Sequence, residues 1–304
     1  MSFAGEVKKE ILRTAPTGLS RIQAQAYGML LFGRSFSRSC IALQTENKEV
    51  ADLYVHNLLD LVPLSGGITT IHHPKKQGGI FVVSVDDEED RISILKAFGH
   101  SPDELNLRIH RALLREDDIP FFLRGAYLVC GNITDPAKGY HAELVVSYRR
   151  LCEDLQQLLM ENGSHPKYAQ RRGVHLLYYK ESEEIEDLLT GMGATQCSLE
   201  LMNVKIYKDV RNKVNRVTNC ETANIEKTVA ASPAQVEDIL YLWEKKGKNS
   251  LPEELQELAQ LRVDNPEMSL RELGEALGEP ITRSGVNHRL KRLSRMAQQL
   301  RGED

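Results

Sequence analysis

Two similar apolar segments, each with an early glycine, constrain the fold of this chain more than any other feature. AYGMLLFGRSFS occupies residues 26–37 and LRGAYLVCGNIT occupies residues 123–134, so that Gly28 and Gly125 lie 97 positions apart. Each segment has the apolar run of a buried helix, a small residue five positions after its glycine and a polar end typical of a turn. The repetition predicts that the chain contains an internal duplication.

Similar elements follow the two glycine-containing helices. Residues 40–45 (CIALQT) and 142–147 (AELVVS) are strand-like, and residues 48–61 and 151–162 are helix-like. Further strands are predicted at residues 68–72, 80–85, 174–179 and 204–207, and further helices at residues 88–98 and 183–189. The repeated order of helix, strand and helix predicts an α+β domain with a pseudo-twofold axis.

The predicted domain organisation has three parts. The duplicated domain should span residues 1–207, with halves of about 1–100 and 119–207, and residues 208–232 should form a linker or connecting helix. Residues 233–304 contain only helical patterns, at 233–246, 252–263, 270–277 and 283–300. The C-terminal part is therefore predicted to be a separate all-α domain.

The last two predicted helices are joined by a short turn. Ser269 can cap the third amide of its helix while Glu272 reaches back to it, and this capping box fixes the helix start. Gly278 is expected to end that helix in the left-handed conformation. Between Ser269 and Gly278, the helix has an apolar stripe that consists of Leu270, Leu273 and Leu277. This pattern resembles a helix-turn-helix DNA-binding unit over residues 269–301.

The final helix has one apolar face, and its other faces are basic or amide-bearing. Although the whole chain has a net charge of −4, residues 282–301 contain six Lys or Arg and no acid. The first turns hold candidates for contact with base edges: Arg283, Asn287 and His288. Candidates for contact with phosphates follow: Arg289, Lys291, Arg292 and Arg295. A solvated face or a protein-docking face is the alternative interpretation.

The two glycine-containing helices resemble the LAGLIDADG motif of homing endonucleases. In that family the two motif helices pack through their glycines at a pseudo-dyad, and each carries an acid that holds Mg²⁺. Gly28 and Gly125 match the glycine of the motif, whereas Gly33 and Cys130 stand at the metal-binding position. Because Mg²⁺ requires hard oxygen ligands, the resemblance implies a nuclease scaffold without catalytic acids or a metal site. A divergent metal-dependent nuclease is the less favoured alternative.

The combination of this scaffold with a C-terminal helix-turn-helix resembles the WhiA family of sporulation regulators. The strongest similarity lies in residues 212–232 and 269–297. It implies a degenerate LAGLIDADG-like domain followed by an all-α helix-turn-helix domain. The implied function is a cytoplasmic, nucleoid-associated DNA-binding regulator of cell division, chromosome segregation or sporulation. A division-associated scaffold with non-specific DNA affinity is the alternative.

Other chemistry has little support in the sequence. The five cysteines form no C-x-x-C pair and the nine histidines show no metal spacing, so we expect no metal site and no cofactor. Short apolar runs predict no membrane association, and no motif indicates a small-molecule substrate. The turns HHPKKQGG and HPKYAQRRG supply basic residues that could contact DNA or a protein partner: Lys75, Lys76, Lys167, Arg171 and Arg172.

Overall fold

The computed structural model describes residues 2–75, 78–104 and 106–303, without the side chains of residues 221, 224–231 and 303. The chain divides into two compact units, Met1–Lys208 and Asp209–Asp304. Each unit has its own cluster of buried apolar side chains. We describe the two units separately.

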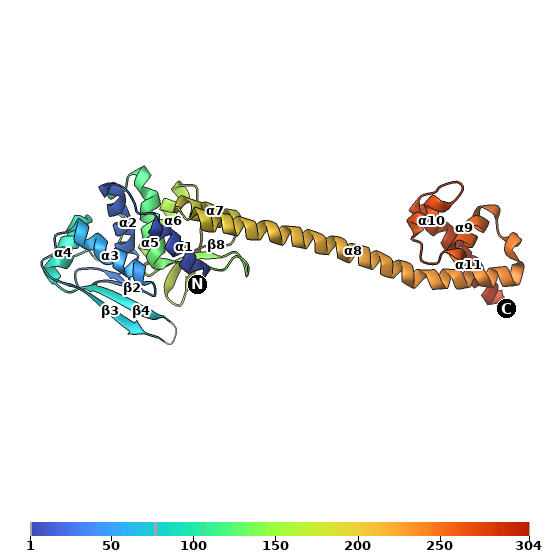
Figure 1. Ribbon diagram of the computed structural model, residues 1–304, viewed down its shortest axis with the longest axis horizontal. Helices are drawn as coiled ribbons and strands as arrows, with labels where there is room; N and C mark the ends of the chain where they lie inside the picture. The colour runs from blue at the N-terminus through green and yellow to red at the C-terminus, as the bar shows by residue number, and fades with distance from the viewer. Residues whose placement is uncertain (1, 76–77, 105, 304) are drawn as a thin grey trace. The chain divides into compact units, whose positions relative to one another are not determined.

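Two helices lie side by side at the centre of the first unit, α2 (Leu19–Leu31) and α5 (Ile119–Cys130) (Figure 1). Their backbones meet at the two motif glycines. A Cβ added to Gly28 would lie 2.2 Å from the carbonyl oxygen of Phe122, and one added to Gly125 would lie 2.0 Å from that of Gln25. Only residues without a side chain permit this reciprocal approach.

Each central helix leads into an antiparallel four-stranded sheet. The first sheet has the order β1-β2-β4-β3 and the second has the order β5-β6-β8-β7, so the two halves share one topology. The strands of the first sheet are β1 (Ser35–Phe36), β2 (Ile41–Thr45), β3 (Ile68–Pro74) and β4 (Gly79–Val85). Those of the second are β5 (Gly131–Ile133), β6 (Ala142–Val146), β7 (Lys167–Arg171) and β8 (Val174–Tyr179). The predicted duplicated α+β fold is confirmed.

The other helices of the first unit are also paired between the halves. Helix α3 (Lys48–Leu61) follows β2, and α6 (Arg149–Glu161) follows β6. Helix α4 (Glu88–Ala97) follows β4, and α7 (Ser182–Gly191) follows β8. Outside this duplication lie α1 (Phe3–Arg13) and two short 3₁₀ helices in the segment between the halves, η1 (Arg111–Leu113) and η2 (Glu116–Asp118).

Two sequence predictions for this unit are wrong. Residues 204–207, predicted as a strand, are helical and belong to α8 (Thr195–Lys246). Four alternating residues fit either structure, and the helix-forming residues before them decide the outcome. The segment HPKYAQRRG, predicted as a turn, contains strand β7, and the turn itself is confined to Arg172 and Gly173, with φ of 51° and 84°. Strand β7 is mostly exposed, so it carries no apolar alternation that would reveal it.

The second unit consists of helices. The C-terminal part of α8, the 3₁₀ helix η3 (Lys248–Ser250), α9 (Glu253–Asp264), α10 (Leu270–Ala276) and α11 (Arg283–Glu303) follow one another along the chain. The predicted helix start at Pro233 is wrong, because Pro233 lies inside α8. Across the described residues, no helix is long and apolar enough to span a bilayer.

Candidate nucleic-acid interface

Helix α11 buries one face in the core of the second unit. The Thr282 hydroxyl accepts a hydrogen bond from the Gly285 amide at 3.3 Å at the start of this helix. The buried side chains are those of the predicted apolar face: Val286, Leu290, Leu293 and Ala297, with Leu300 partly buried. Packing of this face leaves the basic side chains of α11 on the remaining surface.

The side chains predicted to reach base edges lie on the first turns of α11. Arg283 and His288 are exposed and Asn287 is half-buried. As far as the structure describes the chain, none of the three makes a side-chain hydrogen bond or an ion pair. Their donors and acceptors are therefore unused within the folded unit, as a base-reading surface requires.

The predicted phosphate contacts divide into two groups. Lys291 and Arg295 are exposed and have no ion-pair partner among the described residues. The other two arginines contact α9 instead: Arg289 donates to the carbonyl oxygen of Glu254 at 3.2 Å, and Arg292 pairs with the Glu254 carboxylate. Both contacts join α11 to α9, and the ion pair of Arg292 with Glu254 reduces the charge available to DNA.

The last arginine of the basic stretch is also engaged. Arg301 pairs with Asp238 on α8 at 2.8 Å, and its guanidinium lies 4.8 Å from the centre of the Tyr241 ring. Of the six Lys and Arg in residues 282–301, Arg292 and Arg301 therefore pair with carboxylates, and Arg289 donates to a backbone carbonyl oxygen. The other three make neither an ion pair nor a side-chain hydrogen bond among the described residues. These are Arg283, Lys291 and Arg295.

Helix α10 precedes the turn that leads into α11. Its capping box is confirmed: the Ser269 hydroxyl accepts from the Glu272 amide at 3.3 Å, and the Glu272 carboxylate accepts from the Ser269 amide at 2.7 Å. The prediction for Gly278 is wrong, because this residue does not have a positive φ. Instead, Leu277 ends the helix in an extended conformation, and the Gly278 amide donates to Glu257 on α9 at 2.8 Å.

Two residues that the sequence did not single out fix the geometry of this turn. A Cβ on Gly274 would lie 2.4 Å from the carbonyl oxygen of Ile281, so this glycine permits the close contact of α10 with the turn. Arg262 is 1% exposed and donates to the carbonyl oxygens of Pro266 and Met268, at 3.2 and 2.7 Å, just before α10 begins. Burial lowers the pKa of Arg262 from its usual value.

Neither residue at the two acid positions of the motif helices is a ligand for Mg²⁺. Gly33 has no side chain, and a Cβ there would lie 3.0 Å from the carbonyl oxygen of Met29. Cys130 is buried, and burial raises the pKa of its thiol to about 12, so that it stays protonated. A neutral thiol and a glycine do not fit the hard oxygen donors that Mg²⁺ prefers.

A lysine lies near the position of the second missing acid. The Lys8 ammonium on α1 is close enough to Cys130 to counteract part of the effect of burial on the thiol pKa, and burial lowers the pKa of Lys8 itself. Lys8 also lines a cavity of about 630 Å³ beside Val129 and Asn132. Glu46 and Glu49 line the same cavity, but they are outnumbered by Lys8, Lys9 and Lys48, and Lys75 pairs with Glu46 at 3.0 Å. This cationic surface disfavours a divalent cation.

Three more polar side chains near the motif helices have local partners. Arg34 donates to Gln44 at 2.8 Å, and Arg38 pairs with Glu88 at 2.7 Å. Asp135 accepts from the Ala137 amide at 2.9 Å, at the start of the turn that follows β5.

Of the basic residues in the two predicted turns, some form ion pairs and others are exposed. Lys75 and Lys167 pair with Glu46 and Glu181. Arg171 and Arg172 are exposed without an acidic partner among the described residues, and Lys76 lies outside the described residues.

The architecture defines a class of protein, a duplicated LAGLIDADG-like domain followed by a helix-turn-helix domain. Two family profiles match it: the WhiA LAGLIDADG-like domain at residues 119–211 and the WhiA C-terminal HTH domain at residues 214–297. The full-length DUF199/WhiA crystal structure from Thermotoga maritima matches with a TM-score of 0.58 at 23% identity, covering 98% of this chain and 99% of that one.

Similar full-length sequences include curated proteins from clostridia. The probable cell division protein WhiA of Clostridium novyi (strain NT) is 36% identical over 318 residues, which cover 100% of this chain and 99% of the relative. That of Clostridium tetani (strain Massachusetts / E88) is 34% identical over 317 residues, with coverage of 100% and 99%. This chain belongs to the WhiA family, which confirms the resemblance inferred from its motifs.

Proposed function

We propose that this chain is a DNA-binding regulator of cell division that acts on the nucleoid, with α11 as the helix that enters the major groove. The observation that carries this proposal is the face of α11 opposite its core contacts. On this face lie the unpartnered side chains of Arg283, Asn287 and His288. Two cations without an ion-pair partner, Lys291 and Arg295, lie on the same face. Base edges are read by such donors and acceptors, and phosphates by such cations. Roles in chromosome segregation and sporulation belong to the same proposal.

We expect the DNA affinity of the full chain to fall with salt at a log-log slope of about −3. This value follows from three free cations at about −0.9 each, whereas six would give about −5. Titration of a labelled duplex at several salt concentrations measures the slope. Binding that does not depend on salt would contradict the proposed interface.

Matched variants test which cations contribute. Lys291→Ala should make the slope less negative by about one. Removal of the whole Arg292 and Glu254 pair, by Arg292→Ala with Glu254→Ala, should leave the slope unchanged because the pair carries no net charge. A slope near that of six phosphates would instead mean that Arg289, Arg292 and Arg301 exchange their protein partners for DNA.

We further propose that the first unit does not cleave DNA and serves to orient the helix-turn-helix domain or to bind a protein partner. The support is chemical: Gly33 and a buried neutral Cys130 stand at the two acid positions, with Lys8 beside the second. We expect supercoiled plasmid incubated with the protein and Mg²⁺ or Mn²⁺ to remain intact. Metal-dependent nicking that co-elutes with the protein through successive columns would contradict this expectation.

A further inference from the structure

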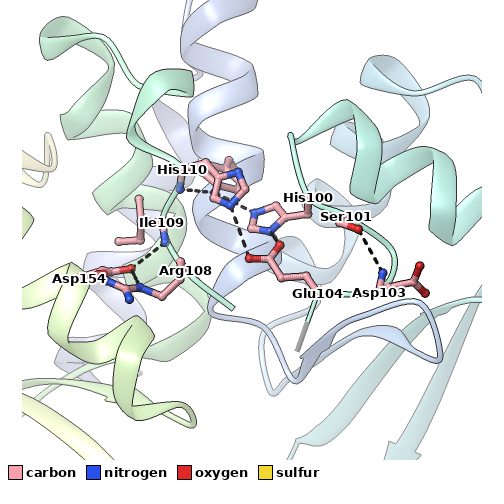
Figure 2. Close-up of polar contacts among 9 residues, drawn as sticks. His100, Ser101, Asp103, Glu104, Arg108, Ile109, His110 and Asp154 are labelled. Carbon is pink, nitrogen blue, oxygen red and sulfur yellow. Dashed lines mark hydrogen bonds and ion pairs between the residues drawn. The ribbon is translucent and has the colours of Figure 1, made fainter. Parts of the chain in front are cut away.

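Two histidines and a glutamate come together in the segment that joins the two halves of the first unit. His100 follows α4, Glu104 lies four residues later, and His110 immediately precedes η1. Figure 2 shows their side chains pointing toward one another. His100 Nδ1 lies 2.8 Å from Glu104 Oε2, His110 Nε2 lies 3.6 Å from Glu104 Oε1, and one ligand atom from each residue lies within 4.8 Å of the others.

Tyr27 on the motif helix α2 makes hydrogen-bond contacts with both histidines of this cluster. The Tyr27 hydroxyl accepts a hydrogen bond from the His110 backbone amide at 2.9 Å and lies 2.9 Å from His100 Nε2. The Nε2 atom of His100 is therefore occupied by the tyrosine, and Nδ1 is the atom that faces Glu104. Hydrogen bonds of this kind orient histidine ligands and fix their tautomers in metal sites.

The cluster is accessible from one side. The side chain of His100 is only 1% exposed, whereas those of Glu104 and His110 are 23% and 33% exposed. A cavity of about 90 Å³ lies beside His100 and Glu104 and has room for a water molecule. An ion could enter through the half-buried residues, and the buried histidine would form the fixed part of the site.

We propose that His100 Nδ1, the Glu104 carboxylate and His110 Nε2 form a Zn²⁺ site. Two imidazoles and one carboxylate are a donor set that Zn²⁺ accepts in proteins, with a water as the fourth ligand. Bond lengths of about 2.0–2.2 Å require neighbouring ligand atoms to lie about 3.3 Å apart. The 3.6 Å spacing of Glu104 and His110 is close to this value. The two imidazole rings are stacked with centroids 4.1 Å apart, so the half-buried His110 ring must rotate out of the stack for both nitrogens to face one ion.

The position of the site indicates a structural role. On the far side of His110, the Asp154 carboxylate on α6 accepts hydrogen bonds from the Arg108 guanidinium, at 2.7 and 2.5 Å, and from the Ile109 amide at 3.0 Å (Figure 2). Asp154 thus holds the connecting segment to the second half. A metal ion bound to His100, Glu104 and His110 would hold the same segment to the first half, beside the motif helix α2.

Metal titration of the chelator-treated full chain tests the proposal. We expect one equivalent of Zn²⁺ to bind, and Co²⁺ to give the intense visible absorption of a tetrahedral site. His110→Ala and Glu104→Gln, both at half-buried positions that tolerate change, should weaken binding at least about 10-fold. Tyr27→Phe should weaken it by about 10- to 100-fold, because it removes the hydrogen bond that orients His100.

A histidine outside the cluster supplies the control. His56 is 71% exposed and lies 3.1 Å from Asp60, so His56→Ala removes an imidazole beside a carboxylate without touching the proposed site. This variant should bind Zn²⁺ like the original chain. The proposal is overturned if no Zn²⁺ binds, if both cluster variants bind as the original does, or if His56→Ala loses binding to the same extent.

Discussion

The Gly125→Ala variant is expected to lose about 3 kcal/mol or more of the free energy of unfolding of the first unit. The added Cβ would lie 2.0 Å from the carbonyl oxygen of Gln25 and 3.0 Å from the amide nitrogen of Met29. Both atoms belong to the backbone of α2, so no side chain can rotate away. The two central helices would have to separate, and the core on both sides of the pseudo-dyad would be disrupted.

Urea denaturation of the full chain, followed by circular dichroism and by tyrosine fluorescence, measures this loss. Gly191→Ala is the matched control, because Gly191 also lies in a helix and a Cβ there meets no atom within 4 Å. It should change the stability by less than about 1 kcal/mol. Equal effects of the two substitutions would mean that the helices do not meet at their glycines.

The sequence reveals the parts of the fold that leave a periodic pattern. The motif helices and their glycines are detectable because a buried helix is apolar on most sides. The apolar face of α11 is detectable because Val286, Leu290, Leu293 and Ala297 repeat at helical spacing. By contrast, the short or exposed strands β1, β5 and β7 leave no such pattern, and only the folded structure reveals them. Helix α1 does show the pattern, with Phe3, Val7 and Ile11 buried at intervals of four, although it is not among the predicted helices.

Long-range contacts explain what the sequence could not predict about the sites. Arg292 and Arg295 look equivalent in the sequence, yet only Arg292 reaches Glu254, which lies 38 positions earlier. Gly274 and Gly278 look equivalent as well, but only Gly274 lies against the backbone of the turn, at the carbonyl oxygen of Ile281. His100 and His110 have no regular spacing in one element, so their meeting depends on how the segment between the halves folds.

Substitution of the base-reading side chains should have the largest effect on sequence-specific DNA binding. Arg283→Ala and Asn287→Ala each remove a side chain that can form paired hydrogen bonds with a base, and each is expected to lower specific affinity by about 10- to 100-fold. The affinity for unrelated duplex should change much less for Asn287→Ala, because that substitution removes no charge. The target sequence can first be selected from random duplexes with the full chain.

Arg271→Ala is the control for these variants. Arg271 lies on α10 and pairs with Glu275 at 2.9 Å, so its loss removes a cation from the same unit without altering α11. Neither α11 substitution touches the buried face, and circular dichroism should therefore show an intact fold. Selection of one sequence with equal affinity by both variants and the original chain would exclude α11 as the reading helix. Genome-wide crosslinking would then distinguish another reading surface from a scaffold that binds DNA without sequence preference, because only the former would recover a shared motif.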